Sequence, residues 1–248
     1  MAKPLGVQLY TVRDRMKSDR DEVLTRIADI GYGAVEAYDP LDDPQGFRRV
    51  VDDLGLVVSG THAIDLLSKD TGAVLDAVAA LGTDSVIVPA GIPAEDFTTR
   101  DGVRRAADLL NGLAEKAAPY GLRLGYHNHW WEIEPRLDGR HAIEVLAGDL
   151  SPGVFLEIDT YWAAVGGADV PELLGRLGDR VTALHVKDGP GVKGEPHTAV
   201  GAGTMPVPDI LAAAGPEAWR IVELDDCATD MLEALAAGYA YLSRLERV

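Results

Sequence analysis

Short apolar runs alternate with longer amphipathic segments along the whole chain. In residues 20–30, for example, Val23, Leu24 and Ile27 recur at helical spacing and fall on one stripe. The pattern predicts strands at Leu5–Tyr10, Ala34–Tyr38, Leu56–His62, Ser85–Pro89, Leu122–His127, Val154–Asp159, Val181–Val186 and Arg220–Asp225. It predicts helices near Arg20–Ile30, Gln45–Leu54, Thr71–Leu81, Arg100–Tyr120, His141–Ala147, Val170–Leu177, Pro208–Ala214 and Ala228–Leu245.

This alternation determines the expected fold class. Strands that are separated by helices pair in parallel, and about eight such units favour a closed (β/α)8 barrel, the TIM barrel. We therefore predict an α/β protein in which residues 1–248 form a single TIM-barrel domain. An open doubly wound sheet is the alternative, but the glycine fingerprint of dinucleotide-binding sheets does not follow the first strand.

Composition and charge exclude several classes of function. The chain has 40 acidic and 23 basic residues and a formal charge of −17, so its field repels phosphate backbones and anionic membranes. The sequence lacks both the roughly 20-residue apolar run of a membrane helix and the apolar core of a signal peptide. Cys227 is the only cysteine, which fits a reducing compartment. We expect a cytoplasmic protein without nucleic-acid or membrane partners, and whether it forms a homo-oligomer stays open.

Polar side chains gather where the predicted strands end. Active sites of these barrels form at the C-terminal ends of the strands, and a charge there is costly unless it is paired or bound to a metal. His127, Asp159, His185 and Glu223 lie near the ends of strands five to eight. These ligand types suit Mn²⁺, Co²⁺, Fe²⁺, Ni²⁺ or Zn²⁺ better than Ca²⁺, so we predict one divalent metal ion, with Mn²⁺ favoured. The structural alternatives are a helix cap for Asp159 and a Lys187 partner for Glu223.

Seven motifs carry a resemblance that covers the chain essentially from end to end. They are Gly6–Arg13, Gly60–His62, Gly125–His129, Leu156–Trp162, Leu184–Asp188, Val200–Thr204 and Ile221–Asp225. As a set they resemble the xylose-isomerase-like barrel superfamily, often labelled sugar phosphate isomerase/epimerase. That superfamily includes epimerases, isomerases, inosose dehydratases, other lyases and a DNA-repair endonuclease.

The resemblance implies a divalent metal held by residues of strands five to eight. Asp159, His185 and Glu223 match three of the ligands, and two positions depart from the pattern of many epimerases. His127 stands where those members carry a glutamate, and Trp162 stands where they often carry a histidine. Since the glutamates of strands five and eight form the proton-transfer pair in epimerases, the first departure bears against a simple two-base reaction.

The chemistry that the resemblance implies is metal-assisted abstraction of a proton next to a carbonyl. Glu223 is the first candidate for the catalytic base and Glu157 is the second, while Lys187 is the candidate group that holds the developing oxyanion. The structural alternatives are an ion pair of Glu157 with Lys187 or Arg123 and an internal salt bridge of Lys187.

The predicted partner is a small-molecule sugar or polyol substrate. Aromatic faces stack on sugar rings, and polar side chains bind their hydroxyl groups. The candidate substrate-binding residues are Gln8, Glu36, His62, His129, Trp131 and Trp162. Three functions follow in order of preference: a metal-dependent isomerase or epimerase of carbohydrate metabolism, a dehydratase-like lyase using the same site, and a non-catalytic sugar-binding barrel.

Overall fold

Parallel strands form the centre of the molecule. The computed structural model describes residues 3–68 and 70–245, so the ends of the predicted 1–248 domain lie outside the described residues. Within these residues eight strands close into a barrel in the order β1-β10-β9-β8-β5-β4-β3-β2. They are β1 (Gly6–Gln8), β2 (Ala34–Ala37), β3 (Val57–His62), β4 (Ser85–Val88), β5 (Arg123–His127), β8 (Phe155–Asp159), β9 (Val181–Val186) and β10 (Trp219–Val222). The predicted TIM barrel is confirmed.

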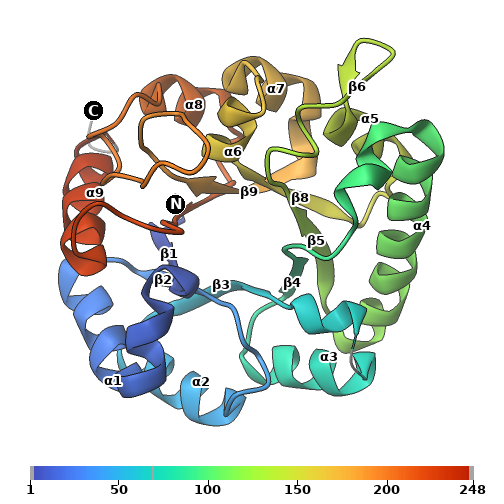
Figure 1. The fold of residues 1–248 in the computed structure, drawn as a ribbon. Coiled ribbons are helices and arrows are strands. Elements are labelled where there is room, and N and C mark those ends of the chain that lie inside the picture. The colour runs from blue at the N-terminus through green and yellow to red at the C-terminus, as the bar shows by residue number, and fades with distance from the viewer. Residues whose placement is uncertain (1–2, 69, 246–248) are drawn as a thin grey trace.

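Helices surround the strands as an outer ring, and Figure 1 shows this arrangement down the barrel axis. They are α1 (Arg13–Ile30), α2 (Pro44–Asp53), α3 (Thr71–Ala80), α4 (Arg100–Ala117), α5 (Ala142–Asp149), α6 (Thr160–Val165), α7 (Val170–Leu177), α8 (Val207–Ala213) and α9 (Met231–Leu245). A small hairpin of β6 (Arg136–Leu137) and β7 (Arg140–His141) projects from the ring before α5. Of the described helices, none is long and apolar enough to span a bilayer.

The predicted boundaries at the start of the chain were wrong, and side-chain hydrogen bonds explain the difference. The first strand ends at Gln8 because its side chain accepts a hydrogen bond from the backbone N–H of Tyr10 at 3.1 Å and starts a 3-10 turn. Helix α1 then begins at Arg13 rather than Arg20. Its backbone departs from helical geometry at Asp19, whose side chain accepts from the N–H of Glu22 at 3.2 Å, so the predicted amphipathic segment is the second part of a longer helix.

The end of the chain shows a second correction. The last strand stops at Val222 rather than Asp225, and α9 begins at Met231 rather than Ala228. Beyond Val222, the N–H of Leu224 donates to Thr11 Oγ1 at 3.0 Å instead of to a neighbouring strand. Elsewhere the boundaries differ by a few residues, and the short helix α6 was not predicted.

The apolar core lies between the barrel and the helices, and the helical stripe predicted for residues 20–30 is buried in it. Inside the C-terminal end of the barrel the residues are polar. The register pairs Gln8 of β1 with Glu36 of β2, and Glu36 with Gly60 of β3. A Cβ on Gly60 would lie 3.1 Å from Glu36 Oε1 and 2.8 Å from Ile87 Cδ1, so glycine leaves room for the buried carboxylate.

Two glycines of α4 test how this helix packs against the segment that precedes it. A Cβ on Gly102 would overlap the backbone carbonyl of Asp96, which cannot move as a side-chain tip can, whereas a Cβ on Gly112 meets nothing within 4 Å. We expect Gly102→Ala to lower the free energy of unfolding by about 1–3 kcal/mol. We expect the control Gly112→Ala to raise it by about 0.5–1 kcal/mol. Urea unfolding measures both, and equal effects would contradict the packing shown here.

Candidate functional site

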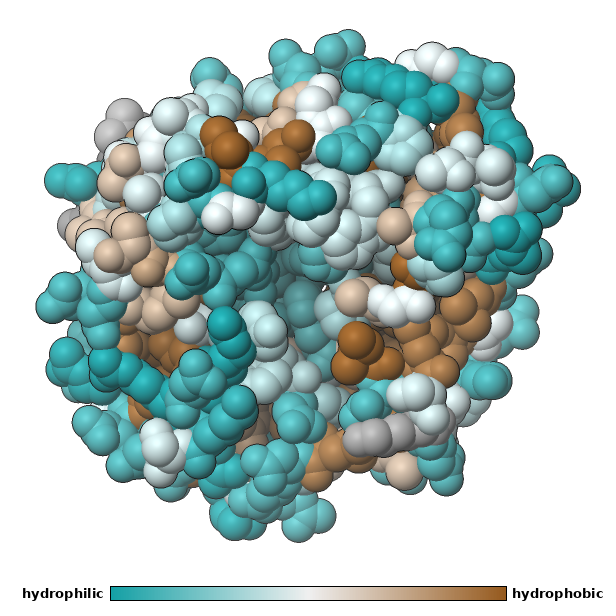
Figure 2. Space-filling model, viewed as in Figure 1, coloured by the Kyte–Doolittle hydropathy of each residue, from teal (hydrophilic) through white to brown (hydrophobic). Residues whose placement is uncertain are grey.

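A cavity of about 560 Å³ opens at the C-terminal end of the barrel. Figure 2 shows it as a hollow in the middle of this face, with hydrophobic side chains on part of its rim. Its lining residues are Tyr10, Arg13, Tyr38, His62, Ile64, Pro89, Ala90, His127, His129, Trp130, Trp131, Trp162, Lys187, Glu223 and Asp225. A second cavity of about 510 Å³ lies at the opposite end, but residues such as Lys3, Arg123 and Gly215 line it and none of its lining residues is a predicted site residue.

The four predicted metal ligands come together at the floor of this cavity, where His127 and Glu223 are among its lining residues. His127 ends β5, Asp159 ends β8, His185 lies on β9 and Glu223 follows β10. One ligand atom from each residue lies within 4.8 Å of the others, and all four side chains are buried. Two imidazoles and two carboxylates are a suitable donor set for a divalent transition metal. Asp159 Oδ2 is buried and lies 2.8 Å from Lys187 Nζ, so this oxygen already faces a cation.

The two oxygens of Asp159 make separate contacts. Oδ1 accepts a hydrogen bond from the N–H of Trp162 at 2.8 Å and caps α6. Oδ2 lies 3.8 Å from His127 Nε2 and belongs to the candidate metal centre. The helix-cap interpretation from the sequence is therefore confirmed, and it does not compete with a ligand role.

A second layer of carboxylates orients the imidazoles from beneath. His185 Nδ1 lies 2.7 Å from Glu223 Oε2, while its Nε2 lies 2.7 Å from Glu36 Oε2. Gln8 Nε2 donates to the same Glu36 oxygen at 2.6 Å. Such outer carboxylates select the tautomer and ring orientation of histidine ligands. Gln8 and Glu36, predicted to bind substrate, therefore lie under the floor of the cavity rather than on its wall.

Glu157 belongs to this lower layer as well. Its Oε2 lies 2.7 Å from His62 Nε2, 3.2 Å from His127 Nδ1 and 3.3 Å from His185 Nε2. The partners of this carboxylate are thus imidazoles, not the Lys187 or Arg123 of the structural alternative. Glu157 is fully buried and does not line the cavity, whereas His62 does.

Burial and neighbouring charges set the protonation of the cluster. Burial, followed by the nearby His185 and His62, lowers the pKa of His127 well below its usual value and favours the neutral imidazole that a metal ligand requires. Burial raises the pKa of Glu36 to about 7. Burial alone would lower the pKa of His185, but the carboxylates of Glu157 and Glu223 outweigh it and raise that pKa well above its usual value.

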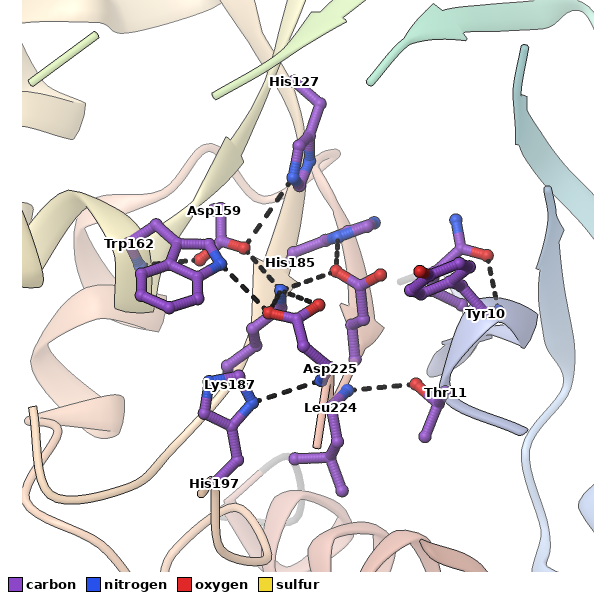
Figure 3. A network of polar contacts seen from close by, with 12 residues as sticks. Tyr10, Thr11, His127, Asp159, Trp162, His185, Lys187, His197, Leu224 and Asp225 are labelled. Atoms are coloured by element: carbon purple, nitrogen blue, oxygen red, sulfur yellow. Dashed lines mark hydrogen bonds and ion pairs between the residues drawn. The ribbon is translucent and has the colours of Figure 1, made fainter. Parts of the chain in front are cut away.

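Lys187 provides the permanent positive charge of the site. Its Nζ lies 2.8 Å from both Asp159 Oδ2 and Glu223 Oε2, so the ion pairs that the sequence offered as structural alternatives for Glu223 and Lys187 are both present. It also donates hydrogen bonds to Asp225 Oδ1 at 3.0 Å and Oδ2 at 2.9 Å. Trp162 Nε1 donates to Asp225 Oδ2 at 3.0 Å (Figure 3).

Three tryptophans form an aromatic wall of the cavity. The ring centroid of Trp130 lies 4.6 Å from that of Trp131 and 4.8 Å from that of Trp162. The His129 ring stacks on Trp131 at 4.1 Å with an interplanar angle of 7°. Burial, followed by the charge of Lys187, lowers the pKa of His129 to about 4, so its imidazole is neutral near pH 7.

The turn that carries Trp130 and Trp131 depends on Glu132, which was not among the predicted site residues. Tyr126 donates its hydroxyl to Glu132 Oε1 at 2.6 Å, and the N–H of His129 donates to Oε2 at 2.8 Å. Arg13 was missed too. It lines the cavity because it donates to the carbonyls of Tyr10 and Asp225, each at 3.0 Å, and its position three residues after Tyr10 was the available signal.

Comparisons with known proteins agree with this architecture. A family model for the xylose isomerase-like TIM barrel matches residues 24–237. The inosose dehydratase of Geobacillus kaustophilus (strain HTA426) is 26% identical in an alignment over 200 residues, and the match covers 68% of this chain and 62% of that protein. The match thus spans less than two thirds of the length of this relative.

Solved structures share the fold at low sequence identity. A sugar phosphate isomerase/epimerase from Parabacteroides distasonis ATCC 8503 has a TM-score of 0.81 at 23% identity and covers 98% of this chain and 94% of its own. An L-ribulose 3-epimerase has a TM-score of 0.73 at 18% identity, covering 100% and 95%. The IolI protein with a bound zinc atom has a TM-score of 0.73 at 15% identity, covering 98% of each chain.

Glu132 generates a prediction about stability and pH. Burial raises its pKa from 4.5 to about 7, so the folded protein holds a proton that the unfolded chain releases. The wild type should therefore lose stability as the pH rises from about 4.5 to about 7. In Glu132→Gln the amide can donate to Tyr126 and accept from His129. Because the amide does not titrate, this variant should not show that loss of stability with rising pH.

We expect the unfolding free energy of Glu132→Gln to gain on the wild type as the pH rises, by up to about 3 kcal/mol above pH 7. Urea unfolding across this pH range measures the difference. Glu134→Gln makes the same charge change at an exposed position and serves as the control. If the difference in unfolding free energy between Glu132→Gln and the wild type stays constant or decreases as the pH rises, Glu132 is not protonated in the folded protein.

Proposed function

Because the chain belongs to the xylose isomerase-like TIM barrel family, we propose that it is a divalent-metal-dependent isomerase or epimerase. Its substrate would be a sugar or polyol ketone, and the reaction would begin with abstraction of an α-proton, which converts the substrate into an enediolate. The observation that carries this proposal is the convergence of His127, Asp159, His185 and Glu223 within 4.8 Å beneath a cavity with an aromatic wall.

The same four residues would hold the metal ion, with Mn²⁺ favoured among Mn²⁺, Co²⁺, Fe²⁺, Ni²⁺ and Zn²⁺. Bound there, a divalent cation would polarise a substrate carbonyl and lower the pKa of the neighbouring C–H. The lower layer would keep the imidazoles in their ligating orientation, with Glu36 acting on His185 and Glu157 acting on His127.

Glu223 is the proposed base because it lines the cavity and is charged near pH 7. Burial alone would raise its pKa, but Lys187 and His185 outweigh burial and hold the pKa well below its usual range. Its carboxylate would take the proton from the substrate carbon. Lys187 would stabilise negative charge on the substrate oxygen. Glu157, the second candidate base, is assigned to orienting imidazoles because His62, His127 and His185 contact it.

The cavity walls support a sugar or polyol as the substrate. Trp131 and Trp162, together with Trp130, offer aromatic faces to the apolar side of a sugar. His62 and His129 would bind hydroxyl groups as neutral imidazoles, because burial lowers the pKa of each to about 4. Gln8 and Glu36 would act on the substrate only through the groups above them.

A lyase is the second candidate function, and a specific observation favours it. Among the described residues, the carboxylates that line the cavity are Glu223 and Asp225, and of these two only Glu223 belongs to the candidate metal centre. One available carboxylate base suits removal of a proton followed by loss of a β-hydroxyl or β-glycosyl group better than proton transfer on two faces. The similarity to an inosose dehydratase points the same way. A non-catalytic sugar-binding barrel is the third candidate.

Metal binding is tested by Asp159→Asn, which keeps an oxygen to cap α6 and removes the charge of the candidate ligand. We expect the wild type to bind about one Mn²⁺ per chain, and the variant to bind it more than about 100-fold more weakly, because even outer-shell changes cost roughly 10- to 100-fold. Calorimetric titration with MnCl2 measures this. Asp169→Asn makes the same change at the exposed cap of α7 and should bind like the wild type. Equal affinities in all three proteins would refute the metal centre.

The reaction type is tested in deuterated water with a series of keto sugars and keto polyols. An isomerase or epimerase incorporates deuterium next to the carbonyl and retains every substituent, whereas a lyase releases water or an aglycone. We expect Glu223→Gln to slow either reaction by about 10²–10⁴-fold. Mass spectrometry of the products decides between the two reactions, and sugar binding without exchange or release would leave the non-catalytic barrel.

A further inference from the structure

Lys187 occupies a place that conflicts with the proposed metal ion. We propose that its ammonium is an internal cation that competes with the divalent ion for Asp159 and Glu223, and that metal binding transfers it entirely to Asp225. This inference rests on the proposed function, because it concerns how the same centre accepts its metal. It assigns Lys187 as a positioning residue that sets metal affinity.

The conflict follows from the contacts of the ammonium. Lys187 Nζ lies 2.8 Å from Asp159 Oδ2 and 2.8 Å from Glu223 Oε2, and these carboxylates supply two of the four candidate ligands. The side chain is only 1% exposed, so water screens its charge weakly. A divalent cation shared by the same two carboxylates would meet a like charge at contact distance. The ammonium therefore has to give up these two ion pairs when the metal binds.

Asp225 provides the position to which the ammonium can withdraw. Lys187 already donates hydrogen bonds to both of its oxygens at 3.0 and 2.9 Å, and neither of these contacts involves a candidate metal ligand. Trp162 Nε1 donates to Asp225 Oδ2, and the N–H of Asp225 donates to His197 Nδ1 at 3.2 Å (Figure 3). Asp225 is thus held in place, and a small shift breaks two ion pairs while both hydrogen bonds remain.

The same arrangement explains why the cation is built into the chain. Asp159 and Glu223 are buried carboxylates, and burying such charges without compensation is costly. Lys187 supplies a positive charge between them before any metal arrives. On Asp225 the ammonium still lines the cavity, where it can bind a substrate oxygen. Lys187 thereby stabilises the buried carboxylates before metal binding, weakens the metal affinity of the candidate centre and binds a substrate oxygen.

Removal of the ammonium tests the competition. We expect Lys187→Met to bind Mn²⁺ at least about tenfold more tightly than the wild type in calorimetric titrations with MnCl2, because a like charge beside the ion is removed. Lys193→Met is the matched control. Its Nζ lies 4.0 Å from the centroid of the Trp130 ring at the exposed rim, and screening there should keep the affinity within about twofold of the wild type.

A second variant tests the place of withdrawal and avoids a buried change. Asp225→Asn can still accept from Trp162 but no longer attracts the ammonium, so Lys187 should remain on the two ligands. The control is Asp226→Asn, which removes one negative charge from the neighbouring, exposed residue. We expect Asp225→Asn to bind Mn²⁺ at least about fivefold more weakly than this control. This comparison decides the inference if Lys187→Met does not fold.

The outcomes separate the inference from the proposed function. A wild type that binds Mn²⁺ as tightly as Lys187→Met, or more tightly, overturns the competition and leaves the metal-dependent function intact. Binding by Lys187→Met but not by the wild type supports the competition and overturns the metal-dependent function. If neither protein binds Mn²⁺, both proposals fail.

Discussion

Charge compensation inside the barrel is the constraint on which the rest of the site depends. Glu36, Glu157, Asp159 and Glu223 are almost completely buried, and carboxylates in such a place are costly unless cations or hydrogen-bond donors face them. The compensating groups are His62 at the end of β3, His127 at the end of β5, and His185 and Lys187 at the end of β9. The closed barrel is what brings these groups together, since only its interior places the ends of β3, β5, β9 and β10 around one point.

The compensation is organised in two layers. In the lower layer, Glu36 and Glu157 bind one nitrogen of an imidazole and so determine which nitrogen faces upward. In the upper layer, His127, Asp159, His185 and Glu223 form the candidate metal centre beneath the cavity. Residues that look equivalent along the chain thus have different neighbours, because they lie at different depths along the barrel axis.

The aromatic wall is held by separate interactions. Glu132 fixes the turn after β5 through Tyr126 and the backbone of His129, so the tryptophans of that turn keep their place. Trp162 is placed by the first turn of α6, whose cap is the candidate metal ligand Asp159. The wall and the candidate metal centre are therefore connected through one carboxylate, although they would serve the substrate and the ion separately.

The sequence by itself determined the barrel and the positions from which a site could be built. The alternation of apolar runs and amphipathic segments predicts parallel strands joined by helices. The ends of the last four predicted strands, which are β5, β8, β9 and β10 in the structure, mark His127, Asp159, His185 and Glu223. Only the tertiary structure decided the depth of each side chain. A spacing of two residues places Glu157 and Asp159 on one face of their strand, but it cannot say that one lies under the imidazoles and the other beside the cavity. The hydrogen bonds of Lys187 to Asp225 and the approach of Arg13 to the cavity were likewise decided by contacts between distant segments, which no local pattern contains.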